Sequence, residues 1–227
     1  TMDQRLLLGH AGALTINSAY TLPTADGSAN QVLTTDGSGT VTWSSVDVSE
    51  LANAITTATS NIGLGSGALD SLTASSGNYN AALGINAGTA VTTGDNNVAV
   101  GYQAFQAATT ASYNTAVGHQ ALNSNTTADA NTAIGQGALE SNTTGEWNTA
   151  VGRIAMLSNT TGHYNVAVGY AALDANTTGE NNVAVGRDAL GANTTAAHNL
   201  GIGRSSLGAN TTGTKNIAIG NYSLDAN

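Results

Sequence analysis

The chain has no cysteine, a single proline and few charges, and these absences narrow the classes of protein to which it can belong. Without cysteine there is neither a disulfide framework nor a thiolate metal site. Only 8% of the 227 residues are charged and 4% are aromatic, whereas about a quarter of the residues of an ordinary globular domain are charged. We therefore expect a surface of Asn, Thr, Ser and Gly around a core of small aliphatic residues.

Positive charge is scarce as well. Lys215 is the single lysine, four arginines accompany it, and the formal net charge is −9. Because phosphate neutralisation requires a cationic face, this composition argues against nucleic acid binding. The longest apolar run near the N-terminus, Leu6–Leu8, is too short for a secretory signal or a membrane span. We expect neither export nor membrane insertion from the sequence given.

A 17-residue internal repeat organises most of the chain. The pattern Asn-x-Ala/Gly-aliphatic-Gly begins at Asn61 and Asn80, then recurs at a constant spacing from Asn80 through Asn97 to Asn216, which makes ten copies. Each fuller copy reads approximately Asn-x-Ala-Val-Gly-x-x-Ala-Leu-x-x-Asn-Thr-Thr-Gly-x-x. Self-similarity at a fixed period is the signature of a repeat architecture.

Each copy contains one alternating apolar segment, one shorter apolar piece and two turns. Residues 182–186 read Asn-Val-Ala-Val-Gly, with the alternation of a β-strand, and Ala189 and Leu190 follow. Gly and Asn-Thr-Thr-Gly supply the turns. One such copy cannot enclose a core alone, and helical repeats need units about twice as long, so coils must stack at about 4.8 Å per coil. The sequence predicts an all-β fold, a parallel β-roll or β-solenoid over residues 61–227.

Two features predict that several chains associate. One small residue per copy, from Ala82 to Ala218, opposes the valines of the strand, and we expect this column to pack against other chains around a common axis. Upstream, a heptad seam predicts a short helical neck over residues 46–60 that joins three chains. A single helix packed on its own chain is the alternative. The seam consists of Val48, Leu51, Ile55, Ala58 and Ile62.

Residues 1–45 lack the repeat and predict a small β module. Two alternating segments, residues 31–35 and 40–43, flank Asp36-Gly37, a strong signal for a β-hairpin. Short apolar pieces broken by Gly9, Gly12 and Pro23 precede them. We expect this module to attach the repeat shaft to something else.

The motifs resemble those of two families. The Asn-x-Ala-Val/Ile-Gly-x-x-Ala repeats resemble the heads of trimeric autotransporter adhesins, which are parallel β-rolls of three chains, although the repeats of those heads are usually shorter than the repeat of this chain. Residues 20–27, 31–37 and 41–43 are similar to stretches common in bacteriophage tail fibres and other virion fibres. An autotransporter needs an export signal and a membrane barrel, whereas a phage protein assembled in its host needs neither.

Together, the resemblances imply a structural protein of a phage virion. It would form a homotrimeric fibre with a role in host attachment, and its N-terminal module would bind other virion proteins. A trimeric adhesin of the bacterial cell surface is the alternative, and a tailspike that degrades polysaccharide is a further one.

Two columns of side chains are the candidate binding positions. The position before the repeat asparagine holds aromatic residues in four copies, which would stack on the sugar rings of a host polysaccharide. Alternatively, these rings shield edges between coils or chains. The four residues are Tyr79, Tyr113, Trp147 and Tyr164. A second column gathers Tyr102, His119, Arg153, Tyr170, Arg187 and Arg204.

No catalytic constellation, metal-ligand spacing or cofactor motif emerges, so we expect no enzyme, no metal and no cofactor. Glu140, Glu146 and Glu180 occupy different repeat positions, so a paired-carboxylate glycosidase site is unsupported. The Asn-Thr-Thr triplets match the glycosylation sequon, but we expect a ladder of turn asparagines instead. Their threonines bear some similarity to those of ice-binding solenoids, yet they are adjacent at a corner rather than alternating along a strand.

Overall fold

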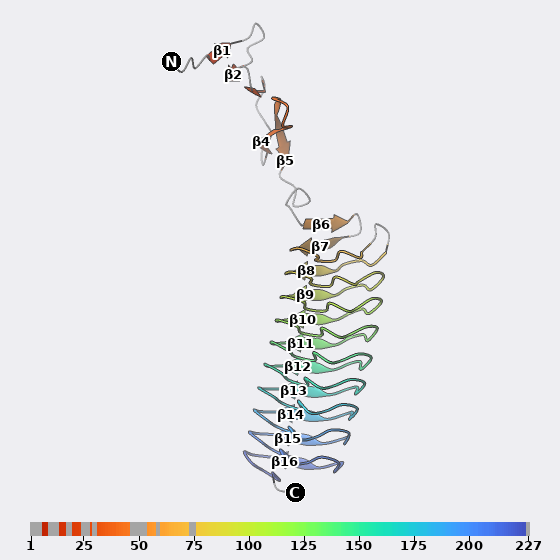
Figure 1. Ribbon diagram of the computed structural model, residues 1–227. Coiled ribbons are helices and arrows are strands. Elements are labelled where there is room, and N and C mark those ends of the chain that lie inside the picture. The colour runs from red at the N-terminus through yellow and green to blue at the C-terminus, as the bar shows by residue number, and fades with distance from the viewer. Residues whose placement is uncertain are drawn as a thin grey trace. The chain divides into compact units, whose positions relative to one another are not determined.

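The computed structural model describes residues 6–8, 14–16, 20–23, 28, 31–45, 54–57, 60–72 and 76–225 (Figure 1). Over these residues the protein is all-β and contains no helix. The chain divides into two compact units, residues 1–51 and residues 52–227.

The described residues of the first unit form two small antiparallel sheets. Strands β1 (Leu6–Leu8), β2 (Leu14–Ile16) and β3 (Tyr20–Thr21) form one sheet in that order. Strands β4 (Gln31–Thr35) and β5 (Val41–Ser45) form a hairpin in which Thr35 faces Val41. The predicted hairpin is therefore confirmed.

The turn of this hairpin is longer than the Asp-Gly pair alone. Residues 36–40 form the loop, and Gly37 and Gly39 adopt φ angles of 77° and 101°. The Asp36 carboxylate accepts hydrogen bonds from the backbone amides of Ser38 (2.8 Å) and Thr40 (3.1 Å). This is the local side-chain capping for which aspartate is favoured in turns.

The second unit is a stack of parallel strands, one per coil (Figure 1). Neighbouring strands pair in register one repeat apart, so that Ala99 faces Ala116 and Ala116 faces Ala133. The first pair, in which Ile62 faces Ala81, spans a coil that is two residues longer. The repeat prediction of a parallel β-solenoid with 17-residue coils is confirmed. The strands are β7 (Asn61–Leu64), β8 (Ala81–Leu83), β9 (Val98–Val100), β10 (Thr115–Val117), β11 (Thr132–Ile134), β12 (Thr149–Val151), β13 (Val166–Val168), β14 (Val183–Val185), β15 (Leu200–Ile202) and β16 (Ile217–Ile219).

The helical neck predicted for residues 46–60 is wrong where the structure describes it. Strand β6 (Ala54–Thr57) runs antiparallel to β7, with Ile55 opposite Gly63 and Thr56 opposite Ile62. The physical reason is the open edge of the first coil, whose backbone groups would otherwise lack partners. The β-branched residues 55–57 suit a strand. Val48, Leu51 and Ala58 lie outside the described residues.

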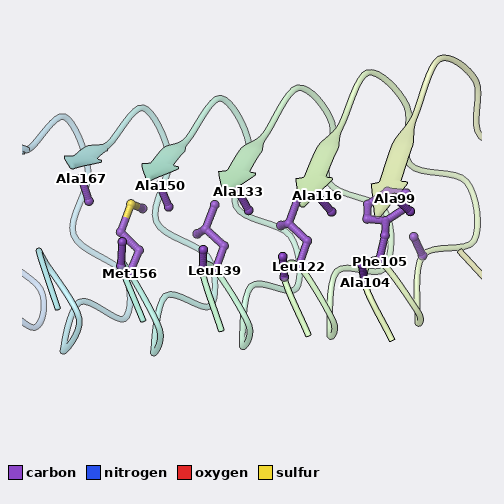
Figure 2. Close-up of a cluster of buried hydrophobic side chains, with 14 of the residues drawn as sticks. Ala99, Ala104, Phe105, Ala116, Leu122, Ala133, Leu139, Ala150, Met156 and Ala167 are labelled. Carbon is purple, nitrogen blue, oxygen red and sulfur yellow. The ribbon is translucent and has the colours of Figure 1, made fainter. Parts of the chain in front are cut away.

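The core lies inside each coil and belongs to a single chain. Figure 2 shows the alanines of the strands, such as Ala116 and Ala133, pointing toward larger side chains such as Leu122 and Leu139 from the far side of the coil. All four are completely buried. The expectation that the small-residue column packs against other chains is therefore wrong: alanine is small because it faces a leucine across a narrow coil.

Two ladders of buried asparagines hold the turns. In the first, the Asn148 side-chain oxygen accepts from the backbone amide of Asn165 (3.0 Å), and its amide group donates to the Gly162 carbonyl (2.8 Å). In the second, Asn159 donates to the side-chain oxygen of Asn142 (2.8 Å). Both ladders repeat coil after coil, so the buried amides are satisfied along the stack.

Candidate functional site

The outward face of the strands is an uncharged, largely aliphatic strip. Because side chains alternate along a strand, burying the alanines turns the residues on either side of them outward. Ile134, Val168 and Ile202 have 41%, 36% and 37% of their surface exposed. The strip extends over ten strands, about 45 Å at the strand spacing of a sheet.

The strip contains two columns of side chains. The first holds Ile62, Ala81, Val98, Thr115, Thr132, Thr149, Val166, Val183, Leu200 and Ile217. The second holds Leu64, Leu83, Val100, Val117, Ile134, Val151, Val168, Val185, Ile202 and Ile219. No charged residue occurs at any position of either column. Of the predicted neck residues, Ile62 therefore lies in this strip at the first coil, and Ile55 lies on β6.

The aromatic column predicted before the repeat asparagines lies on the surface of the same unit. Tyr79, Tyr113, Trp147 and Tyr164 are all more than half exposed. Each adopts a left-handed backbone conformation, with φ between 58° and 61°. Asn96 and Asn181 occupy the same column at φ 57°, and asparagine tolerates this conformation better than a bulky residue does.

A polar column adjoins the aromatic one, because the position before it carries an acceptor in several coils, including Asp95 before Asn96 and Asp129 before Ala130. The Asp129 carboxylate accepts from the Ser112 backbone amide (2.7 Å), and the Asp95 carboxylate accepts from the Asn78 amide (2.6 Å). The Glu146 amide donates to Nδ1 of His163 (3.0 Å). These bonds join the corners of neighbouring coils and leave Asp129 beside the rings of Tyr113 and Trp147.

One hollow interrupts the aromatic column. Tyr113, Asp129, Ala130 and Trp147 line a space of about 430 Å³, almost all of it apolar. It exists because Ala130 stands where the neighbouring positions carry rings. The residues of the aliphatic strip do not line it.

The second predicted column forms a ladder of rings and cations. The Arg153 and Arg187 guanidinium carbons lie 5.5 and 5.7 Å from the centre of the Tyr170 ring, one from each neighbouring coil. Tyr102 stacks on His119 with ring centres 5.3 Å apart. Arg187 also pairs with Asp188 (3.0 Å). The arginines therefore stack on rings of the same chain, which is a stabilising arrangement.

The asparagines of the Asn-Thr-Thr triplets are unsuited to modification. Asn125, Asn142 and Asn159 are completely buried. Asn142 donates to the side-chain oxygen of Asn125, and Asn159 donates to that of Asn142, along the second ladder. The predicted ladder of turn asparagines is confirmed. The first threonines donate to the next coil, as from Thr143 Oγ1 to the Thr160 carbonyl (3.0 Å). The second threonines, including Thr144 and Thr161, are exposed.

The carboxylates of the solenoid are scattered over its surface. Burial raises the pKa of Asp174, and the nearby charge of Asp188 raises it further. Within the described residues there is no group of three or more His, Asp and Glu side chains that could hold a metal ion. That part of the chain also contains no helix long and apolar enough to cross a membrane.

Sequence reasoning identified both columns but missed the hollow and the direction of the strand faces. The signal for the hollow is Ala130, a small residue in the coil between the two that carry Tyr113 and Trp147. The strand faces were predicted in the wrong direction, with the alanines outward, because an alternating Val-Ala-Val segment fits both directions. The leucines fill the interior and leave room there only for alanine.

Comparison with known proteins finds no matching family model, no similar curated protein and no similar solved structure. The structure thus shows a β-solenoid, and function has to be argued from its surfaces.

Proposed function

We propose that this protein is a structural fibre protein of a phage virion whose solenoid forms a trimeric shaft involved in host attachment. The observation that carries the proposal is the aliphatic strip. Soluble monomers rarely expose a long contiguous apolar surface, and such a surface marks an interaction site. The strip carries no charge over ten coils, so chains that pack along it bury no unpaired ion.

A second copy of the same chain is the natural partner for this strip. The strip repeats at the coil spacing, and another copy presents the same spacing, so side chains interdigitate along the full length. The number three comes from the resemblance of the repeats to the heads of trimeric adhesins. The proposed interface differs from the one expected from sequence, since it uses the valines and not the alanines.

The virion assignment rests on the resemblance of the N-terminal stretches to phage fibres, and it includes attachment of the N-terminal module to other virion proteins. The hairpin β4–β5 exposes Val32 and Leu33, which supports a contact with another protein. A bacterial surface adhesin with the same trimeric roll is the second candidate. Its support is the repeat pattern alone, and a membrane anchor encoded in the same gene would establish it.

Light scattering tests the shaft. We expect the full chain to have the mass of three chains, and an Ile134→Lys, Val168→Lys variant to have the mass of one. The matched control, Thr144→Lys with Thr161→Lys, adds the same charge at exposed corner positions and should remain trimeric. A parent protein with the mass of one chain would refute the trimeric shaft.

A further inference from the structure

We propose that the hollow between Tyr113 and Trp147 binds one uncharged hexopyranose ring of a polysaccharide that runs along the aromatic column. The inference deepens the attachment role of the proposed function, but its geometry lies within one chain. It therefore does not depend on the number of chains in the fibre.

The first argument is the backbone cost of these rings. A bulky residue in the left-handed region costs about 1–3 kcal/mol unless its surroundings compensate. Leu139 and Leu173 also adopt this conformation, at φ 51° and 55°, but they are completely buried and fill the core. Tyr113 and Trp147 are 66% and 57% exposed, so burial within this chain does not offset their strain. The corner imposes this conformation in every coil of the column, at Ala130 and Lys215 as well, so the observation that points to a ligand is the choice of exposed bulky rings at such a corner.

The second argument is the width of the hollow. Tyr113 and Trp147 are two coils apart, so their backbones are separated by about 9.6 Å. Carbon atoms in contact lie about 3.5–4.0 Å apart, so a flat aromatic ligand leaves part of this width empty. A puckered saturated ring presents C–H groups on both faces and fills it. The negative faces of the Tyr and Trp rings favour those C–H groups.

The third argument is the polar rim. The Asp129 carboxylate borders the hollow and holds the Ser112 amide with one oxygen, Oδ1. A carboxylate oxygen accepts at more than one lone pair, so Asp129 retains capacity for a sugar hydroxyl. Asp129 is the one polar side chain among the four residues that line the hollow, besides the Tyr113 hydroxyl and the Trp147 ring N–H. A carboxylate at the hollow, on a chain of net charge −9, disfavours an acidic sugar.

The fourth argument is the direction of the column. Tyr79 and Tyr164 continue it on both sides of the hollow, so a linear polymer laid along the solenoid meets several rings. None of the strip residues lines the hollow, so the hollow is a separate feature of the surface.

Tryptophan fluorescence of the full chain tests the inference. The chain has two tryptophans, so a Trp43→Phe background leaves Trp147 as the single reporter. Chitotetraose, cellotetraose and maltotetraose serve as uncharged probes, and a hyaluronan tetrasaccharide serves as the acidic one. We expect at least one uncharged probe to change the Trp147 emission in a saturable manner and the acidic probe to leave it unchanged. Absence of any saturable change with the three uncharged probes, or binding of the acidic probe alone, would overturn the inference.

Two further variants separate recognition from stability. Ala130→Phe fills the hollow, and Tyr113→Asn removes one wall with a residue that this column already contains at Asn96 and Asn181. Each should weaken binding about tenfold, which corresponds to about 1.4 kcal/mol, the first by blocking the hollow and the second by removing a ring contact. Tyr113→Asn should keep or raise the melting temperature, because it relieves backbone strain. Unchanged affinity in both variants would overturn the inference.

A matched control removes a ring elsewhere. Tyr102→Ala deletes an exposed ring of the second column and should leave affinity unchanged. An equal loss of affinity in this control would overturn the assignment to the hollow. Light scattering of the same samples reports the assembly, so a trimer that binds no sugar refutes this inference alone, whereas a monomer that binds sugar refutes only the trimeric shaft.

Discussion

The hairpin β4–β5 and the coil stack β7–β16 are both built from strands, but they are stabilised in different ways. The hairpin exposes Val32, Leu33 and Trp43, and its order comes from turn chemistry around Asp36. The stack buries a continuous column of alanine and leucine and two asparagine ladders. A two-stranded hairpin is at best marginally stable alone, whereas each coil of a stack is stabilised by its two neighbours. The comparison predicts that single substitutions act cooperatively in the stack and locally in the hairpin.

The largest effect should come from the glycine that ends each strand of the stack. Gly169 has a φ angle of 138°, and a Cβ atom there would lie 2.6 Å from the carbonyl oxygen of Gly186 in the next coil. Gly169→Ala should therefore cost roughly 3 kcal/mol or more of unfolding free energy, measured by urea denaturation followed by circular dichroism. Gly37→Ala, at φ 77° in the hairpin with open space around it, is the matched control and should leave the stack transition unchanged. Equal loss of stack stability in both variants would contradict the comparison.

A smaller but still large effect should follow removal of one ladder asparagine. Asn148 accepts from Asn165 and donates to Gly162 and to the side-chain oxygen of Asn131. Asn148→Ala leaves buried groups of both neighbouring coils unsatisfied, which should cost about 2–4 kcal/mol in the same denaturation experiment. The control is Asn181→Ala. Asn181 is exposed and belongs to the column of residues that precede the repeat asparagines, which carries an alanine in another coil, Ala130. A loss below about 0.5 kcal/mol for Asn148→Ala would show that the ladder is not a stabilising element.

Acid should act locally in the hairpin. Hydrogen bonds from the Ser38 hydroxyl and from the Ser38 and Thr40 backbone amides lower the pKa of Asp36 to about 2, from an ordinary value of 3.8. Since the folded pKa lies below the unfolded one, the stabilisation is complete above pH 3.8 and is lost as the pH falls toward 2. Nuclear magnetic resonance of the Ser38 and Thr40 amides should show this loss. Asp36→Ala should remove the pH dependence, and its persistence in that variant would assign it to another group.

The smallest effect should be a gain in stability at Asp174. Burial and then the charge of Asp188 raise its pKa above 3.8, so the carboxylate destabilises the fold at neutral pH. Protonation removes this destabilisation as the pH falls through the raised pKa toward the unfolded value. Asp174→Asn should therefore raise the melting temperature slightly at neutral pH and have progressively less effect as the pH approaches 3.8. A variant that is less stable than the parent at neutral pH would contradict this account.

The sequence predicts the architecture well because the information is repeated. The constant spacing of the repeat alone leads to the parallel register and to the turn asparagines such as Asn142. It did not determine which side of each strand faces inward, since an alternating Val-Ala-Val segment is compatible with both directions. The leucine on the far side of the coil decides this, as Figure 2 shows for Leu122 and Ala116.

The predicted neck had no such redundancy. The apolar spacing that includes Ile55 and Ile62 fits a heptad, but the same residues also fit two paired strands, and the open edge of the first coil favours the pairing. The hollow beside Ala130 was missed for a related reason. The hollow depends on the alanine of a single coil, whereas a repeat pattern contains only what the copies have in common.

Spin labels on the outward strip test the central claim most directly. The chain contains no cysteine, so Val151→Cys places a single label on the strip, and Thr161→Cys places one at an exposed corner. Pulsed electron resonance should give one distance between labels on different chains for each variant, with a modulation depth that corresponds to three spins. The account predicts that the distance is markedly shorter for Val151→Cys than for Thr161→Cys. The absence of coupling between chains in both variants, or a shorter distance at Thr161, would contradict it.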